Sequence, residues 1–550
     1  MEVSADIRAL VDYACDCGLI DCEDRVWAYN TILEAIGVTG PEPGSEWTLA
    51  DEYRFPCMTA DPDPFCDDDE VIIADEDEEE GRPDFDLDGV LARLSEVAVA
   101  AGVTDDTASG RDRASMRIMG ILMPRPSQVT LLFEEALRSL NARVATDWFY
   151  RLCCDSGYVR RTAIARNIAW NAATPWGELE ITINRSKPEK DPREIAAAGA
   201  RATSGEVYPA CQLCVENEGY PGRGAAAEGG AHPARQNLRI VPIELDGDRW
   251  GLQYSPYAYF NEHCIAMSAH HRHMHIDRAA LRCLLDFVDL VPHYFIGSNA
   301  DLPIVGGSIL SHDHFQGGDH EFPMMRAKVA STFAFADEGG QARFPGVTGA
   351  VLEWPLSVLR LQSSGREELL EAAVHVIDSW RAYSDESVGV VAHDADGTPH
   401  NTVTPVVRRT PDGGYEVYLA LRCNIATDEH PLGVFHPHAE WHHIKKENIG
   451  LIEVMGLAIL PPRLVDELAA VRSHLLAGEL GALEADPLSA SHASWAREVA
   501  EKHPELGEDS AEAIIRQEVG VVFGHVLEDA GVFKWDEAGR AAQQRFIDAL

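Results

Sequence analysis

The chain has 550 residues, of which 45% are hydrophobic and 25% charged, and its formal net charge is −44. This length is too great for one hydrophobic core and predicts about two to four compact units of roughly 100–200 residues each. The negative charge excludes nucleic acid and anionic membrane surfaces as bulk partners, because the protein's own field repels a polyanion. An anionic small substrate would need local donors such as main-chain amides, clustered Arg and Lys, or a metal ion.

Other sequence features bound the class of protein. No run approaches the roughly 18 apolar residues that suggest a membrane span, and the acidic N-terminus lacks an apolar signal core. We therefore expect a cytoplasmic protein. The 12 cysteines are scattered through the chain, so we expect reduced thiols rather than a disulfide framework. The oligomeric state is left open, with a homodimer as one expectation.

The first part of the chain is expected to be mainly helical. Residues 6–37 place apolar side chains at the spacing of a buried helical stripe. Residues 61–88 are dense in carboxylates and predict a solvated insertion, because like charges repel one another. A second helical segment is expected over 128–146. Together these patterns predict a helical N-terminal region over 1–165 with an acidic insertion near 61–88.

Strand patterns begin after this region. Residues 178–183 alternate between polar and apolar side chains, which predicts a half-buried strand. Asp277 stands at the cap position of a helix that runs towards His293. Further strands are expected at 238–243 and 252–267, and the segment 302–318 reads as another.

A second set of similar elements follows, and then helices. We expect a helix near 367–383 and a hairpin whose turn is 410–414 and whose return strand is 415–421. From Pro462 onwards the periodicity is helical. This order predicts an α+β fold with two related halves, 166–335 and 336–461, and a helical C-terminal extension over 462–550.

The segment from Leu302 to Gly318 places polar residues in an apolar strand. Because strand side chains alternate between faces, His312, His314 and Gln316 are expected on one face. Glycines 306, 307, 317 and 318 bracket this set, and a residue without Cβ lets a phosphate approach main-chain N–H groups. A neutral imidazole can attack phosphorus near pH 7. Alone, a His-x-His strand is also typical of metal sites and of well-packed cores.

This His-x-His-x-Gln strand, with its glycines, resembles the active-site strand of the galactose-1-phosphate uridylyltransferases in the histidine-triad superfamily. Further segments resemble the second class of these enzymes, namely 186–192, 232–239 and 433–450. The resemblance implies two histidine-triad-like halves with antiparallel sheets. It also implies an enzyme of galactose metabolism that moves UMP from UDP-glucose to galactose 1-phosphate through a covalent uridylyl-histidine intermediate.

The resemblance also implies roles for individual residues. His314 is the expected nucleophile, and Gln316 is expected to donate its amide to a phosphoryl oxygen. Asn299 is expected at the substrate, with Asp301 or Ser298 as alternatives, because two extra residues separate Asn299 from His312 relative to the first class. Gly306, Gly307 and Ser308 are expected at a phosphate. The diphosphate is expected at Arg235 and Arg239 or at Lys187 and Lys190, and the sugar phosphate at Lys445 and Lys446.

Cys211-Gln-Leu-Cys214 has the Cys-x-x-Cys spacing that lets two thiolates bind one zinc ion. A redox pair of the thioredoxin kind would need a βαβ context, which this segment lacks. In the first class of the family a comparable pair binds structural zinc with two histidines, which by position implies His271 and His312. The other candidates for the histidine ligands are His270, His273 and His263. No organic cofactor is expected.

His436 and His438 occupy the region where the first class binds a structural iron. We find no glutamate that would complete such a site, so these histidines are expected either to line the substrate pocket or to bind nothing.

Other functions remain open at this point. A histidine-triad hydrolase or dinucleotide phosphorylase would use water or phosphate as the acceptor in place of the sugar phosphate. A His-x-His oxygenase would need a carboxylate and a third histidine around an open metal position. The least favoured alternative is a non-catalytic acidic binding protein. The sequence does not distinguish galactose 1-phosphate from the N-acetylhexosamine 1-phosphates as acceptor.

Overall fold

The computed structural model describes residues 3–42, 85–186, 207–225, 227–306, 309–336 and 339–550. The chain divides into two compact units. Unit 1 comprises Met1–Thr162, Pro188–Ile243 and Arg249–Ala258. Unit 2 comprises Ala163–Lys187, Glu244–Asp248 and Tyr259–Leu550. Among the described residues, no helix combines the length and the apolarity needed to cross a membrane.

Helices dominate the first part of unit 1, as expected. They are α1 (Val3–Asp16), α2 (Arg25–Ala35), α4 (Leu87–Ala100), α5 (Ala108–Ile121), α6 (Pro126–Ser139) and α7 (Ala142–Asp155), with the short α8 (Arg161–Ile164) at the unit's edge. Their buried faces include Ile7, Leu10 and Val11 of α1, which have no exposed surface. Most of the expected acidic insertion lies outside the described residues.

Two expected helices are each divided into two. The expected helix 6–37 ends as α1 at Asp16, because Gly18 takes a left-handed backbone with φ of +66°. The expected helix 128–146 is interrupted at Asn141, whose Oδ1 accepts the Val144 amide at 3.0 Å and so caps α7. In both cases a local cap overrides a continuous apolar stripe.

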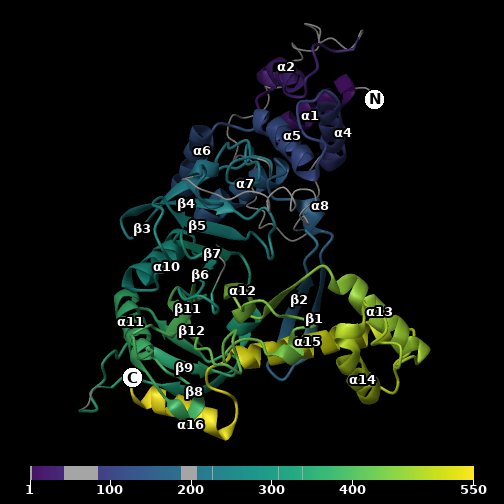
Figure 1. Cartoon of the computed structure of the whole chain (residues 1–550). Coiled ribbons are helices and arrows are strands. Elements are labelled where there is room, and N and C mark those ends of the chain that lie inside the picture. The colour runs from purple at the N-terminus through teal and green to yellow at the C-terminus, as the bar shows by residue number, and fades with distance from the viewer. Residues whose placement is uncertain (1–2, 43–84, 187–206, 226, 307–308, 337–338) are drawn as a thin grey trace. The chain divides into compact units, whose positions relative to one another are not determined.

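The main sheet of unit 2 is antiparallel throughout. Its strands run in the order β5-β7-β6-β11-β12-β10-β9-β8, with helices α10 and α11 beside it (Figure 1). Their bounds are β5 (Cys264–Ser268), β6 (Phe295–Gly297), β7 (His314–Gly318), β8 (Val329–Phe333), β9 (Thr348–Leu352), β10 (Val358–Ser363), β11 (Asn401–Arg409), β12 (Tyr415–Cys423), α10 (Arg278–Leu290) and α11 (Arg366–Ala382). The expected α+β class with antiparallel sheets is therefore confirmed.

Several local predictions are also confirmed in unit 2. Asp277 caps α10, because its Oδ1 accepts the Ala280 amide at 3.0 Å. The predicted return strand is β12, which pairs with β11 along its whole length. The expected strand 252–267 is two strands, β4 (Asp248–Tyr254) and β5, and the strand expected at 238–243 is β3 (Val241–Leu245). Strands β3 and β4 each contain a boundary between the two units.

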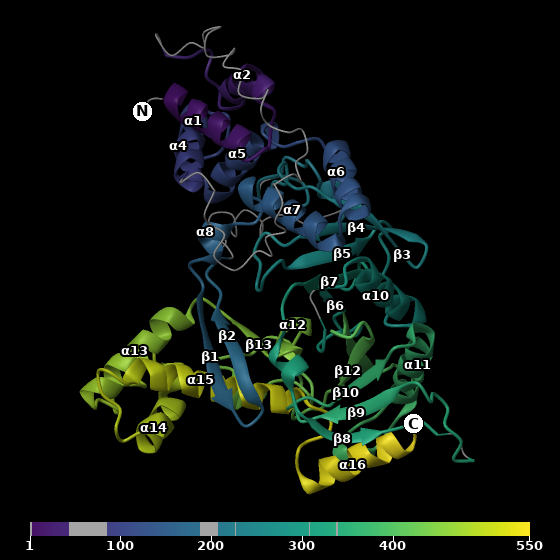
Figure 2. The ribbon, with the colours of Figure 1, turned by 180° about the vertical axis from the view of Figure 1, so that it is seen from behind.

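A second sheet of unit 2 joins distant parts of the chain. The hairpin of β1 (Ile168–Thr174) and β2 (Gly177–Ile183) is antiparallel, and β13 (Leu457–Leu460) lies parallel to β2 (Figure 2). Helix α15 (Ala511–Ala530) packs on this hairpin, where a Cβ on Gly520 would collide with the Ala172 side chain. The remaining helices are α12 (Leu451–Val454), α13 (Leu464–Ala477), α14 (Ala493–Lys502) and α16 (Glu537–Asp548).

Candidate active site

The expected strand that carries three polar residues is shorter than the pattern predicts. Strand β7 begins at His314, so the expectation that His312 lies in the strand is wrong. The Asp313 carbonyl still accepts the Ser268 amide at 3.0 Å, but the Asp313 amide donates to the Arg272 carbonyl at 2.8 Å. The chain after Ser268 therefore leaves the strand direction, and its hydrogen bonds to the β7 segment end at Asp313 without reaching His312.

His314 has a defined tautomer. Its side chain is buried, and Nδ1 lies 2.8 Å from the main-chain oxygen of His312, which only accepts hydrogen bonds. Nδ1 therefore carries the proton and Nε2 the lone pair. Burial lowers the pKa of His314 below its ordinary value, which keeps the ring neutral at pH 7. The arrangement provides an uncharged imidazole with one nucleophilic nitrogen.

Gln316 lies two residues further along β7, on the same face as His314. Its cross-strand partners are Ile265 on β5 and Gly297 on β6, so the amide is half-buried between two neighbouring strands. Oε1 of Gln316 lies 3.0 Å from Nε2 of His263. The carbonyl oxygen of the Gln316 amide is thus held by His263, which leaves the amide nitrogen for a ligand.

The described glycines around β7 are needed for main-chain packing. A Cβ on Gly306 would collide with the carbonyl oxygen of Ala300, and one on Gly317 with that of Phe295. Their lack of a side chain is therefore explained by close approach of the backbone. Gly307, Ser308, Lys187 and Lys190 lie outside the described residues.

Asn299, just after β6, connects the end of that strand to α12. Its side chain is buried, and Oδ1 accepts the Leu451 amide at 2.9 Å. Of the alternatives, Ser298 donates its hydroxyl to the Asn299 carbonyl at 2.9 Å. Asp301 accepts the Ile276 amide at 2.9 Å and pairs with Arg381 at 3.1 Å. Asn299 keeps its amide nitrogen for another partner, whereas Asp301 has a structural role.

The cationic residues expected at the phosphates have different surroundings. Arg239, in unit 1, is 5% exposed, and its guanidinium donates to the carbonyls of Pro124 and Leu238 at 2.7 Å each. Arg235 is half-buried, with its guanidinium 5.9 Å from the ring centroid of Tyr158. In unit 2, Lys445 is buried and pairs with Glu453 at 2.9 Å. Of these three side chains, Arg235 is the only one that is not buried.

The thiol pair expected at zinc is preformed in unit 1. Sγ of Cys211 lies 3.1 Å from Sγ of Cys214. The side-chain amide of Asn217 donates to the carbonyls of both cysteines, at 2.8 and 2.9 Å. Burial and the neighbouring thiol raise the pKa of Cys214 to about 12. Nothing in the sequence singles out Asn217, although it fixes the turn that holds both thiols.

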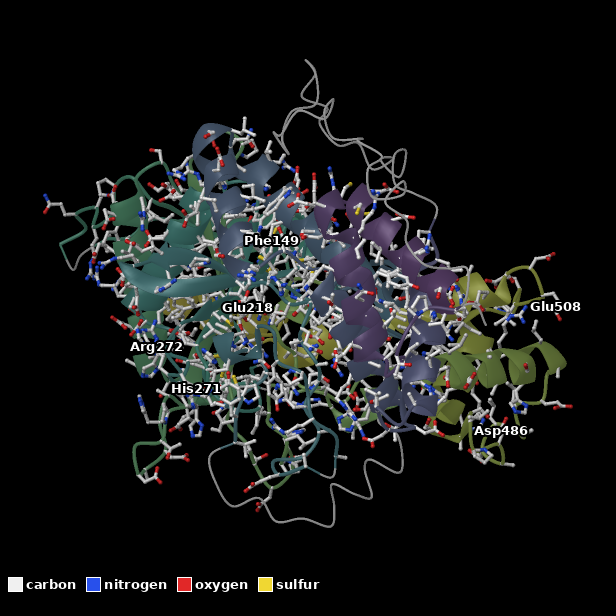
Figure 3. The ribbon with its side chains drawn as sticks, turned by 90° about the horizontal axis from the view of Figure 1, so that it is seen from above. Phe149, Glu218, His271, Arg272, Asp486 and Glu508 are labelled. Carbon is white, nitrogen blue, oxygen red and sulfur yellow. The ribbon has the colours of Figure 1, made fainter. Side chains whose placement is uncertain are left out.

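The histidine pair expected at zinc lies in unit 2. The rings of His271 and His312 have centroids 4.5 Å apart, and Figure 3 labels His271 next to Arg272. Nε2 of His312 lies 2.9 Å from the Ser268 carbonyl oxygen, which only accepts hydrogen bonds, so Nε2 carries the proton. A histidine that binds metal through one ring nitrogen usually donates such a hydrogen bond from the other. Sulfur and imidazole nitrogen are the ligands that structural zinc takes, so both pairs suit that ion.

The other histidines considered above as metal ligands or pocket residues lie close to polar groups near them. His270 lies 3.6 Å from Asp248, and Nδ1 of His273 lies 3.2 Å from the Met274 carbonyl. Nε2 of His436 lies 3.2 Å from the Asn448 side chain, and Nδ1 of His438 lies 3.3 Å from Asp529. Each is explained by its immediate neighbours.

Comparison with known proteins gives consistent matches over most of the chain. The galactose-1-phosphate uridyl transferase N-terminal domain matches residues 80–273, and its C-terminal domain matches residues 287–497. A galactose-1-phosphate uridylyltransferase of Bacillus subtilis is 43% identical to this chain, and the match covers 100% of this chain and 98% of that protein. One of Streptococcus pneumoniae is 48% identical over 83% of this chain and 88% of its relative. Among solved structures, yeast Ap4A phosphorylase is 12% identical with a TM-score of 0.29, covering 58% of this chain and 90% of that one.

Proposed function

Since this chain belongs to the galactose-1-phosphate uridylyltransferase family, we propose that it moves a uridylyl group from UDP-glucose to galactose 1-phosphate through a covalent bond to His314. The hydrogen bond from Nδ1 of His314 to the His312 carbonyl is the observation that carries this proposal. It supports a neutral ring whose Nε2 lone pair is available for attack.

The reaction has two displacement steps. In the first, Nε2 of His314 attacks the α-phosphorus of UDP-glucose, the bond from that phosphorus to the bridging oxygen breaks, and glucose 1-phosphate leaves with the electron pair. In the second, a phosphate oxygen of galactose 1-phosphate attacks the uridylyl-histidine, and UDP-galactose leaves while the imidazole regains its lone pair. The covalent intermediate divides one difficult transfer between two anions into two easier ones.

Other side chains hold the phosphates in this proposal. The amide nitrogen of Gln316 donates to a non-bridging oxygen, where negative charge increases in the transition state. Asn299 contacts the substrate, and Arg235 is the cation best exposed for the diphosphate. The remaining proposed phosphate contacts are Gly306, Gly307, Ser308 and Lys187, whereas the guanidinium of Arg239 already donates to backbone carbonyls.

We also propose that Cys211, Cys214, His271 and His312 hold one structural zinc ion. When bound, zinc would fix the position of His312, whose carbonyl orients His314. No organic cofactor takes part. The enzyme is proposed to work in the cytoplasm on small sugar nucleotides, without nucleic acid or membrane partners.

Intact mass spectrometry tests the covalent step. Wild-type protein is incubated with UDP-glucose alone, under a mildly basic quench because phosphoramidates are labile to acid. We expect a uridylyl adduct that galactose 1-phosphate discharges, and no adduct on His314→Asn. Discharge by water or phosphate at a comparable rate would favour a hydrolase or phosphorylase instead. Absence of an adduct, together with an active His314→Asn variant, would rule out the covalent mechanism.

A further inference from the structure

His263 lies directly behind Gln316 and has no role in the proposed mechanism. It precedes β5, is 2% exposed, and places Nε2 at 3.0 Å from Oε1 of Gln316. Its ring packs on Phe260 with centroids 4.4 Å apart and lies 5.6 Å from the Tyr259 ring. The surroundings of the ring are therefore mainly aromatic, with one polar contact.

The protonation state of this ring follows from its surroundings. Burial in an aromatic pocket lowers the pKa of His263 to about 4, so the ring is neutral at pH 7 and carries one N–H. Nδ1 is buried without a hydrogen-bond partner among the described residues. A proton on Nδ1 would leave a buried donor unsatisfied, which is costly. The proton therefore belongs on Nε2, where it can donate to Gln316.

This tautomer determines which way the Gln316 amide points. An Nε2–H group needs an acceptor, so it selects the orientation in which the carbonyl oxygen of Gln316 faces His263. The amide nitrogen, with both its hydrogens, then faces away from His263. With the opposite orientation, two donors would face each other at hydrogen-bond distance.

We propose that His263 is a positioning residue that sets the amide of Gln316 so that its N–H groups face the transferring phosphoryl group. This inference rests on the proposed function of Gln316 as a phosphoryl donor. His263 itself touches no reacting atom. It acts by removing the orientation in which the Gln316 oxygen would meet, and repel, an anionic phosphoryl oxygen.

A double-mutant cycle tests the proposal. The assay is exchange of labelled glucose 1-phosphate into UDP-glucose, which reports the first displacement alone. His263→Phe keeps a flat ring against Phe260 and removes the donor, and we expect exchange to slow by about 10- to 100-fold. His263→Gln keeps an N–H near the position of Nε2, and we expect at least a third of the wild-type rate. In the Gln316→Ala background, His263→Phe should change the rate by less than about twofold.

The outcomes separate positioning from mere structural support. A slow Phe variant that the Gln variant rescues, with no further effect in the Gln316→Ala background, supports the proposal. A Phe variant at the wild-type rate, or effects that multiply in the double mutant, would overturn it. Equal slowing by Phe and Gln with unchanged melting temperatures would also overturn it. Absence of exchange in the wild type would overturn both this inference and the proposed function.

Two further variants guard against misfolding. His263→Leu repeats the test with a smaller side chain if Phe lowers the melting temperature. The matched control is His375→Phe on α11, because His375 also packs on aromatic rings, those of Phe335 and Phe344, in unit 2. It should leave the exchange rate unchanged.

Discussion

Nδ1 of His314 lies 2.8 Å from the carbonyl oxygen of His312, so the residue two positions before the proposed nucleophile sets its tautomer. The same His312 uses its own Nε2 to hold the Ser268 carbonyl at 2.9 Å. A ring and a main-chain carbonyl thus link the end of β5 to the start of β7, and the lone pair at Nε2 of His314 depends on that link.

The pH dependence of the reaction follows from burial of His314. Only the neutral ring can attack phosphorus, and burial lowers its pKa below the ordinary value of about 6.5. We expect kcat/KM for UDP-glucose to stay level above pH 7 and to fall only at pH values below about 6.5. A pH profile measured in constant ionic strength checks this. An acid limb centred above pH 7 would contradict a neutral buried nucleophile.

Zinc content tests the proposed metal site. We expect about one zinc ion per purified chain, measured by elemental mass spectrometry, and a lower melting temperature after removal by a chelator. Cys211→Ser should lose most of the metal. Cys423→Ser is the control, because Cys423 is buried on β12 and forms no part of the proposed site. Equal zinc content in both variants would place the metal elsewhere.

Arg239 is expected to act on stability. Its buried guanidinium donates to the carbonyls of Pro124, Gln236 and Leu238. Replacing it by Met leaves these carbonyls unsatisfied and should lower the free energy of unfolding by about 3 kcal/mol or more. Arg235→Met, in the same segment but half-buried, should lower it by less than about 1 kcal/mol. Calorimetry of both variants gives the comparison. Similar melting temperatures would show that the carbonyls find other donors.

A pair of histidines in the C-terminal part predicts pH-dependent stability. Nδ1 of His443 lies 2.8 Å from Nδ1 of His492, whose Nε2 lies 3.0 Å from Glu467. Burial, with His492 and Arg463 nearby, lowers the pKa of His443 to about 3. The unfolded chain binds this proton at pH values near 6.5 and the folded chain does not, so stability present above about pH 6.5 is lost as the pH falls.

The expected size of this effect is up to about 1.4 kcal/mol per pH unit for His443 below pH 6.5. Urea unfolding between pH 7.5 and 5.0 measures it. His443→Gln should show a shallower loss of stability than the wild type. His393→Gln, at an exposed position, should run parallel to the wild type. A parallel His443→Gln curve would show that other groups cause the dependence.

Local patterns were sufficient to predict parts of the fold from sequence. The alternation at 178–183 predicts β2, and Asp277 predicts the start of α10, because each depends on nearby residues alone. The start of β7 at His314, after His312, could not be predicted, since it depends on the hydrogen bond from the Asp313 amide to the Arg272 carbonyl, a contact between separate segments.

The candidate site shows the same division. The spacing of His314 and Gln316 is visible in the sequence, whereas the support from His263 behind Gln316 comes from the pairing of β5 with β7. Arg239 resembles a phosphate ligand in sequence, yet its charge is surrounded by backbone carbonyls. A motif therefore shows which side chains are present, and the tertiary structure decides which of them are already hydrogen-bonded to other parts of the protein.

The parallel pairing of β13 with β2 has a consequence for synthesis. On the ribosome, the β1–β2 hairpin leaves the exit tunnel long before residues 457–460 exist, so its third strand is missing from the nascent chain. At roughly 5–20 residues per second, this wait lasts from about 10 s to 1 min. Throughout that interval the outer edge of β2 has unpaired N–H and C=O groups, which makes it a natural binding place for chaperones.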